Sequence, residues 1–207
     1  ATGLASSGGS FGAFCLPPIA QLLVSGVGWR RAYVIFGAAI LLALNLLAPL
    51  MKRDPEGLGL TPDGDRPAAS GGDPLPRGSD YTMSQAMRTR AFWVLYALFA
   101  ATWIPIFAPL VHLVPLARGL GVDPLVAATL VSALGMAGIV GRLVMGAASD
   151  RFGRRPAIGI CLVLQVAAFL GFAAAGTLPG LYAASITFGY SYGAISSLFP
   201  AVVADFF

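Results

Sequence analysis

The chain has 207 residues, of which 57% are hydrophobic and only 11% are charged. Because a soluble domain carries about 25% charged residues, this composition excludes an ordinary soluble globular domain and a disordered chain. The net charge of +4 is modest and no basic patch is interleaved with aromatic residues, so nucleic-acid binding is not expected. The two cysteines, Cys15 and Cys161, lie alone in apolar runs, and we expect neither a metal site nor a cofactor.

Long apolar runs dominate the sequence. A transmembrane helix needs about 20 mainly apolar residues, and six runs are close to that length. They cover residues 2–27, 32–51, 92–117, 125–148, 157–175 and 178–206. Between the second and third runs, residues 52–90 carry charges of both signs with many Gly and Pro residues, which is typical of a solvated linker. The sequence therefore predicts an all-α membrane protein with six transmembrane helices and a long cytoplasmic loop after the second.

The distribution of Lys and Arg indicates how these helices are oriented in the membrane. If residue 1 lies in the cytoplasm, nine basic residues fall on the cytoplasmic side and three fall outside, namely Arg30, Arg31 and Arg118. This excess favours that orientation, although the linker supplies six of the nine. Ala1 begins inside an apolar pattern and Phe207 ends without a polar tail, so we expect a fragment of a longer multi-pass membrane protein.

One basic residue, Arg142, belongs to neither side of the membrane. It lies eight residues before Asp150, or about 12 Å along a helix, which is near the midplane of a hydrocarbon layer about 30 Å thick. An ionised side chain at that depth is costly unless it faces a bundle interior or a watery cavity. We therefore interpret Arg142 as an anion-binding residue. The structural alternative is an arginine that pairs with a carboxylate or caps the carbonyls of a broken helix.

Small residues share the helix face on which Arg142 is expected, namely Gly135, Gly138, Gly146 and Ser149. Such a stripe lets another helix approach closely, or it leaves space for a ligand beside the guanidinium. A planar guanidinium binds a carboxylate through two parallel hydrogen bonds. A small carboxylate is therefore the expected ligand.

A pattern of glycines and charges follows Arg142 and is made of Gly146, Asp150, Arg151, Gly153, Arg154 and Arg155. It resembles the cytoplasmic loop signature of the major facilitator superfamily. The resemblance implies a partial major-facilitator-type bundle, in which the six runs are helices 5 to 10 of twelve. Residues 1–51 would be the last two helices of the N-terminal bundle, 52–90 the cytoplasmic inter-bundle linker, and 91–207 the first four helices of the C-terminal bundle. The resemblance also implies that the loop is a cytoplasmic gate; the alternative is a topology signal.

Within that superfamily, residues 1–8, 28–30, 107–111 and 188–197 resemble stretches of monocarboxylate transporters and bacterial oxalate/formate antiporters. In those relatives an arginine at the place of Arg142 binds the substrate carboxylate. An aromatic residue and a serine one turn apart line the same pocket, and these correspond to Tyr192 and Ser196. Proton-coupled relatives carry an aspartate where this chain has Gly138, so proton coupling cannot run through that residue.

Aromatic residues recur at helical spacing along the first run after the linker. Two of them, Trp103 and Phe107, lie at mid-depth and are further candidates for the substrate pocket. Helix packing or lipid contact is the alternative interpretation of such a stripe.

The sequence thus predicts a secondary active transporter that moves a small organic anion, such as lactate, pyruvate, oxalate or formate, by alternating access. Its expected partners are that anion, the lipid bilayer, and a proton or a counter-transported anion, and its expected location is the bacterial inner membrane. Two alternatives stay open: a major-facilitator exporter or facilitator of drugs or sugars with a structural Arg142, and a non-transporting membrane sensor or scaffold. No HExxH or P-loop pattern occurs, so an enzyme is not expected.

Overall fold

The computed structural model describes residues 2–50 and 83–206, and this part of the chain contains only helices and their connections. The helices are, in chain order, α1 (Thr2–Val27), α2 (Trp29–Leu47), the 3₁₀ helix η1 (Ala48–Leu50), α3 (Met83–Met87), α4 (Arg90–Gly119), α5 (Pro124–Phe152), α6 (Arg154–Ala174) and α7 (Leu178–Phe206). Six of them are long and apolar enough to cross a membrane. The predicted all-α membrane architecture is therefore confirmed. Residues 51–82, which hold most of the predicted linker, lie outside the described residues.

The helices extend further than the apolar runs that predict them. Helix α4 begins at Arg90 and α5 continues to Phe152, so Asp150 and Arg151 belong to the last turn of α5 instead of a loop. The connection to α6 is the single residue Gly153, which has a φ of 91°. Hydropathy marks where a helix leaves the hydrocarbon layer, whereas backbone hydrogen bonds continue until a residue such as this glycine breaks them.

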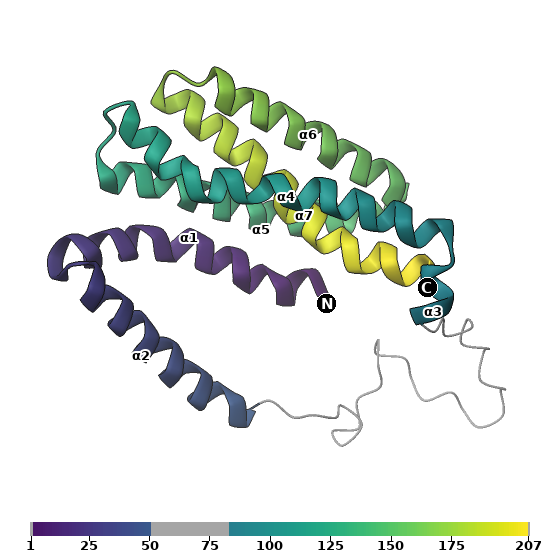
Figure 1. Ribbon diagram of the computed structural model, residues 1–207, viewed down its shortest axis with the longest axis horizontal. Helices are drawn as coiled ribbons and strands as arrows, with labels where there is room; N and C mark the ends of the chain where they lie inside the picture. Colours follow the sequence, from purple (N-terminus) through teal and green to yellow (C-terminus); the bar gives the residue numbers. More distant parts are fainter. Residues whose placement is uncertain (1, 51–82, 207) are drawn as a thin grey trace.

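The helix starts are fixed by short local signals. Asp123 caps α5, because its Oδ1 accepts hydrogen bonds from the backbone N–H of Leu125 at 2.8 Å and of Val126 at 3.4 Å. Thr89 caps α4 by accepting from the backbone N–H of Phe92 at 3.3 Å. Gly28, with a φ of 82°, separates α1 from α2. Gly28 and the connection that ends at Asp123 are short links between consecutive long helices, so the chain reverses direction at both (Figure 1).

Four helices, α4 to α7, lie together as a bundle, and α1 runs alongside α5, while α2 splays away (Figure 1). The connections α1–α2, α4–α5 and α6–α7 all lie at the end opposite the N-terminus (Figure 1). The core between α4, α5 and α7 holds Ile106, Leu130, Leu181 and Phe188, each at most 1% exposed. Helix α2 buries only Ala32. The site described below lies where α1, α5 and α7 meet.

Glycines bring α5 and α7 into backbone contact. A Cβ atom added to Gly189 would overlap the carbonyl group of Leu134, and one added to Gly193 would overlap that of Gly138. In the same way, a Cβ on Gly141 would overlap the carbonyl group of Tyr190. Only residues without a side chain allow two helices to approach so closely.

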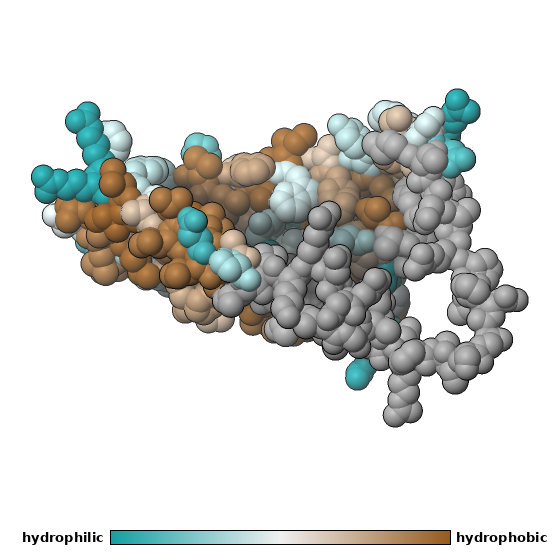
Figure 2. Space-filling model, turned by 90° about the horizontal axis from the view of Figure 1, so that it is seen from below, coloured by the Kyte–Doolittle hydropathy of each residue, from teal (hydrophilic) through white to brown (hydrophobic). Residues whose placement is uncertain are grey.

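The surface matches this membrane architecture. In the coloured part of Figure 2, hydrophobic residues cover most of the surface, and the most hydrophilic residues lie mainly toward its ends. Apolar side chains such as Leu41, Ile104 and Val163 are more than 60% exposed. An apolar band between polar ends is what a bilayer requires of a protein that spans it.

Candidate functional site

Arg142 is buried in the middle of α5, with 7% of its surface exposed. Its Nε donates a hydrogen bond of 2.9 Å to Oγ of Ser196 on α7. The Ser196 hydroxyl in turn donates to the backbone carbonyl of Gly193 at 2.8 Å. The two residues are 54 positions apart in the chain, and the α5–α7 crossing at Gly138 and Gly193 brings them together one turn further along. The structure therefore unites two of the residues that the sequence singles out.

The stripe of small residues beside Arg142 is mostly used for packing. Gly135 lies against the backbone of Phe14 in α1, and a Cβ on Gly138 would lie 3.0 Å from Oγ of Ser10. Gly146 has open space within 4 Å among the described residues, and Ser149 bonds back to its carbonyl at 2.8 Å. Gly135 and Gly138 thus allow α1 to pack closely against α5. Close helix packing is one of the two predicted uses of the stripe, and space for a ligand is the other.

Tyr192 belongs to an aromatic cluster next to this site. Its ring stacks on Phe188 at 6.3 Å and meets the ring of Trp103 edge-on at 5.9 Å. The indole N–H of Trp103 is buried without an acceptor among the described residues. Phe107, the other aromatic candidate, is 62% exposed on the outside of α4, so the structure does not bring it into this cluster. The sequence could not reveal that Phe107 points away from the cluster, because a spacing of four residues between Trp103 and Phe107 specifies a shared helix face only approximately.

The predicted loop signature lines a cavity of about 670 Å³ at the end of α5, and its wall contains charged residues. Asp150, Gly153, Arg154 and Arg155 all contribute to its wall. Arg154 also donates a hydrogen bond to the backbone carbonyl of Ala201 in α7, which ties the start of α6 to the end of the bundle. Gly146 and Arg151, the other signature residues, belong to the last turns of α5 but not to the wall of this cavity.

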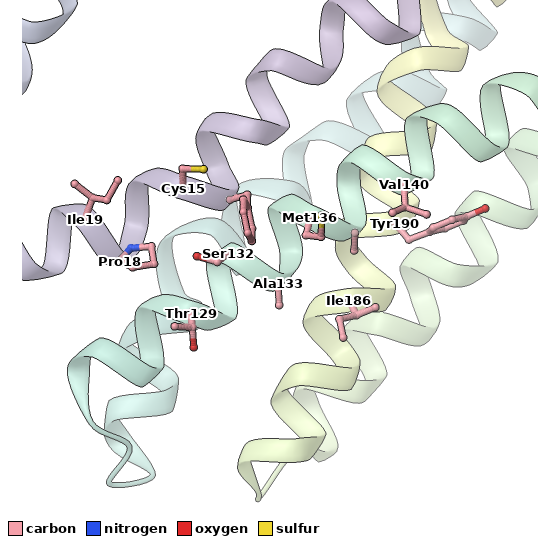
Figure 3. Close-up of a pocket in the computed structure, with 12 residues that line it drawn as sticks. Cys15, Pro18, Ile19, Thr129, Ser132, Ala133, Met136, Val140, Ile186 and Tyr190 are labelled. Carbon is pink, nitrogen blue, oxygen red and sulfur yellow. The ribbon is translucent and has the colours of Figure 1, made fainter.

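A second cavity of about 780 Å³ lies between α1, α5 and α7 (Figure 3). Its wall includes Cys15, Met136 and Ile186, and no residue of the wall is charged. Oγ of Ser132, which also lines it, is buried without a hydrogen-bond partner among the described residues. This cavity suits apolar groups, and Arg142 does not line it.

Gln165 is among the buried polar residues that the sequence analysis does not single out. Gln165 of α6 is 5% exposed, and its Nε2 donates to the backbone carbonyl of Thr102 in α4 at 3.3 Å. Its Oε1 has no partner among the described residues. A glutamine inside an apolar run is the signal that could have drawn attention to it. Within residues 2–50 and 83–206, no group of three His, Cys, Asp or Glu side chains is placed to hold a metal ion.

Comparison with known families agrees with this architecture. The family model described as "Major Facilitator Superfamily" matches residues 1–207, the whole chain. The chain belongs to the major facilitator superfamily. The predicted resemblance is thereby confirmed, and the chain is a multi-pass membrane protein. Its superfamily and its relatives are transporters rather than enzymes.

Several relatives of this major facilitator chain are monocarboxylate transporters. "Monocarboxylate transporter 12-B" of Danio rerio is 30% identical over 226 residues, which cover 99% of this chain and 47% of that protein. "Monocarboxylate transporter 12" of Rattus norvegicus is 31% identical, with 99% and 46% covered. The "Uncharacterized MFS-type transporter YhjX" of Escherichia coli is 29% identical, with 89% and 44% covered. The chain thus spans less than half the length of these relatives, most of which are animal proteins. A bacterial inner-membrane location stays a prediction.

Proposed function

We propose that the chain forms part of a secondary active transporter that moves a small mono- or dicarboxylate, such as lactate, pyruvate, oxalate or formate, by alternating access. We infer that residues 1–51 are the last two helices of one bundle, 91–207 the first four helices of the other, and 52–90 the cytoplasmic linker between them. The observation that carries the proposal is the buried Arg142 in the middle of a membrane span. Several relatives named as monocarboxylate transporters support the carboxylate class.

A buried arginine in a membrane span needs a compensating role, because its desolvation costs several kcal/mol. Ser196 holds the guanidinium at Nε. A guanidinium can bind a carboxylate through two parallel N–H donors at the spacing of the carboxylate oxygens. Arg142 would thus anchor the anion and Ser196 would position the anchor.

The aromatic cluster would form one wall of the same pocket. Tyr192 lies one turn before Ser196 on α7 and its ring contacts Trp103, whose indole N–H has no acceptor among the described residues. A transported carboxylate could accept this bond when it passes. Phe107 is 62% exposed, so its side chain would reach the pocket only if α4 rotated or moved.

The charged cavity at the end of α5 supports a gate at the cytoplasmic side. Asp150, Arg154 and Arg155 line it together, and opposite charges at helix ends can hold two elements closed and release them. Coupling would proceed by exchange for a second anion or by another proton path, because Gly138 occupies the place of the titratable residue in proton-coupled relatives.

The proposal is tested by reconstituting the full-length protein that contains this chain in proteoliposomes and measuring uptake of labelled lactate, pyruvate, oxalate and formate. The variants are Arg142→Gln and Arg142→Lys, and Arg118→Gln is the control, because Arg118 is exposed at the outer end of α4. Loss of a charged hydrogen bond of about 1.5–3 kcal/mol predicts about a 10- to 100-fold lower kcat/KM for Arg142→Gln. Normal carboxylate uptake by Arg142→Gln, or transport of a neutral substrate only, would contradict the proposal.

A further inference from the structure

Two consecutive prolines interrupt the backbone hydrogen bonding of α1 in the middle of its membrane span. Pro17 and Pro18 lie inside the helix, and a proline has no backbone N–H to donate to the carbonyl group four residues earlier. The carbonyl groups of Ala13 and Phe14 therefore lack the donor that a regular helix would supply. Inside a bilayer, neighbouring helices and Ser or Thr side chains serve such carbonyl groups, so a donor is expected on a helix next to α1.

Ser132 of α5 lies level with this pair of prolines. Gly135 lies against the backbone of Phe14, and a Cβ on Gly138 would lie 3.0 Å from Oγ of Ser10. The two helices are therefore antiparallel, and three residues along α5 correspond to four residues along α1. The same step in the other direction from Gly135 places Ser132 beside the prolines. Ser132 and the second proline both line the apolar cavity, and Figure 3 shows the Ser132 oxygen on the side of α1.

The hydroxyl group of Ser132 is a buried donor without an acceptor. The residue is 7% exposed, and its Oγ has no hydrogen-bond partner among the described residues. A buried hydroxyl without a partner costs free energy, and so does a carbonyl group that has lost its donor. One donor and two candidate acceptors thus lie at the same level of two adjoining helices without being joined in this conformation. A movement of α1 that joined them would relieve both costs.

The apolar cavity gives α1 room for such a movement. It measures about 780 Å³, and its wall includes residues on both sides of the prolines, among them Phe14 and Ile19. Before the prolines, α1 packs closely on α5, and Ser10 is only 4% exposed. After the prolines the contact is loose, since residues 24–27 are all exposed. The two halves of α1 are therefore held differently, and they meet at the prolines.

We infer that α1 bends at the two prolines, so that residues 19–27 close into the cavity toward α7 while Ser132 donates a hydrogen bond to the carbonyl group of Ala13 or Phe14. Closure replaces an empty apolar cavity by apolar packing, and it gives the Ser132 hydroxyl an acceptor. The bend and the open conformation described above are then two states of one hinge. The hinge acts on the helix contact between α1 and α5 whatever the chain transports, so the inference goes beyond the proposed function.

The test measures closure by disulfide crosslinking in proteoliposomes that contain the full-length protein. Leu22→Cys and Ala183→Cys place thiols on α1 and α7, in a Cys15→Ala background. Leu22 lies one turn beyond Pro18, and Ala183 lies about one turn before Ile186, so each continues the face of its helix that lines the cavity. A disulfide forms only when the two Cα atoms come within about 4.4–6.8 Å. The rate of crosslinking after addition of copper phenanthroline therefore reports how often the two helices meet.

The two thiols should crosslink, and the rate should fall about 10-fold when Pro17→Ala and Pro18→Ala together restore the missing N–H groups. Ser132→Ala should also slow crosslinking while the prolines are present, and it should have no further effect once they are replaced. Ser197→Ala is the matched control and should leave the rate unchanged, because the Ser197 hydroxyl donates to the carbonyl of Ala194 in its own helix at 2.9 Å.

Each part of the inference has an outcome that would overturn it. An equal rate with and without the prolines would overturn the hinge, and no crosslink in a folded protein would overturn the closure. An effect of Ser132→Ala that persists after the prolines are replaced would overturn its role as the donor. Thermal unfolding checks that each variant is folded. None of these measurements needs a substrate, so a failure of the proposed function would leave the result on the hinge unaffected.

Discussion

A methyl group on Gly193 would separate α5 from α7 at the crossing that supports the site. The Cβ of an alanine at this position would lie 2.6 Å from Cα of Gly138 and closer still to its carbonyl oxygen. Ordinary van der Waals contact begins at 3.4 Å, so the helices would have to part by about 0.8 Å or more. Both partners of the Arg142–Ser196 hydrogen bond lie one turn beyond this contact, and they would be pulled apart with the helices.

The expected loss of stability follows from two opposing terms. Overpacking of a tight contact costs about 1–3 kcal/mol, while replacing glycine by alanine stabilises a compatible helix position by about 0.4–1 kcal/mol. We therefore expect Gly193→Ala to lower the free energy of unfolding by about 1–2 kcal/mol. Transport should fall as well, because a hydrogen bond of 2.9 Å between Arg142 and Ser196 tolerates little separation.

A graded series of alanine variants measures this effect by thermal unfolding of the purified full-length protein. Gly159 has no described atom within 4 Å of its Cβ position, Gly171 would place a Cβ 3.2 Å from Cβ of Ala184, and Gly193 would overlap backbone. The melting temperatures should therefore fall in the order Gly159→Ala, Gly171→Ala, Gly193→Ala, with the first at or above the wild type. A Gly193→Ala protein that melts with Gly159→Ala would refute the close crossing.

Two further predictions concern residues away from this crossing. N-ethylmaleimide should modify Cys15, which is partly exposed in the apolar cavity. It should not modify Cys161, which is 0% exposed, until the protein is denatured. Peptide mass spectrometry locates the modified cysteine, and equal labelling of both cysteines in the folded protein would contradict the burial of Cys161. Gln165→Leu should leave the melting temperature unchanged or raise it, since the variant removes an amide with one long hydrogen bond and a buried oxygen without a described partner. A clear drop in its melting temperature would show that the amide is satisfied in the native protein.

Much of the fold could be predicted from the sequence, because a membrane span needs a long apolar run and the charges mark its ends. The six predicted runs correspond to six helices. The apolar run that predicts α5 ends at residue 148, whereas the helix continues to residue 152, because hydropathy falls at Ser149 and Asp150 although the backbone stays helical. The single-residue connection between α5 and α6 depends on the backbone φ of 91° at Gly153. A glycine permits this φ value, but the presence of a glycine does not specify it.

The candidate site could be predicted only in part. The depth of Arg142 follows from counting residues along one helix, whereas its partner Ser196 depends on how α5 and α7 cross. That crossing is set by glycines 138 and 193, and nothing in the sequence says which of its many glycines face each other. Of the two uses predicted for the stripe, close packing is found at Gly135 and Gly138, whereas Gly146 has no described atom within 4 Å of its Cβ position.

The hydroxyl group of Ser196 has a fixed polarity, and this polarity restricts the direction from which an anion can come. Its hydrogen atom is directed at the Gly193 carbonyl, and only its lone pairs face Nε of Arg142. A hydroxyl held in this way accepts a hydrogen bond from a cation but has no hydrogen to offer a carboxylate. A carboxylate held by Arg142 would therefore be bonded by the guanidinium alone, and the α7 edge, where the Ser196 oxygen lies, would offer it no hydrogen bond.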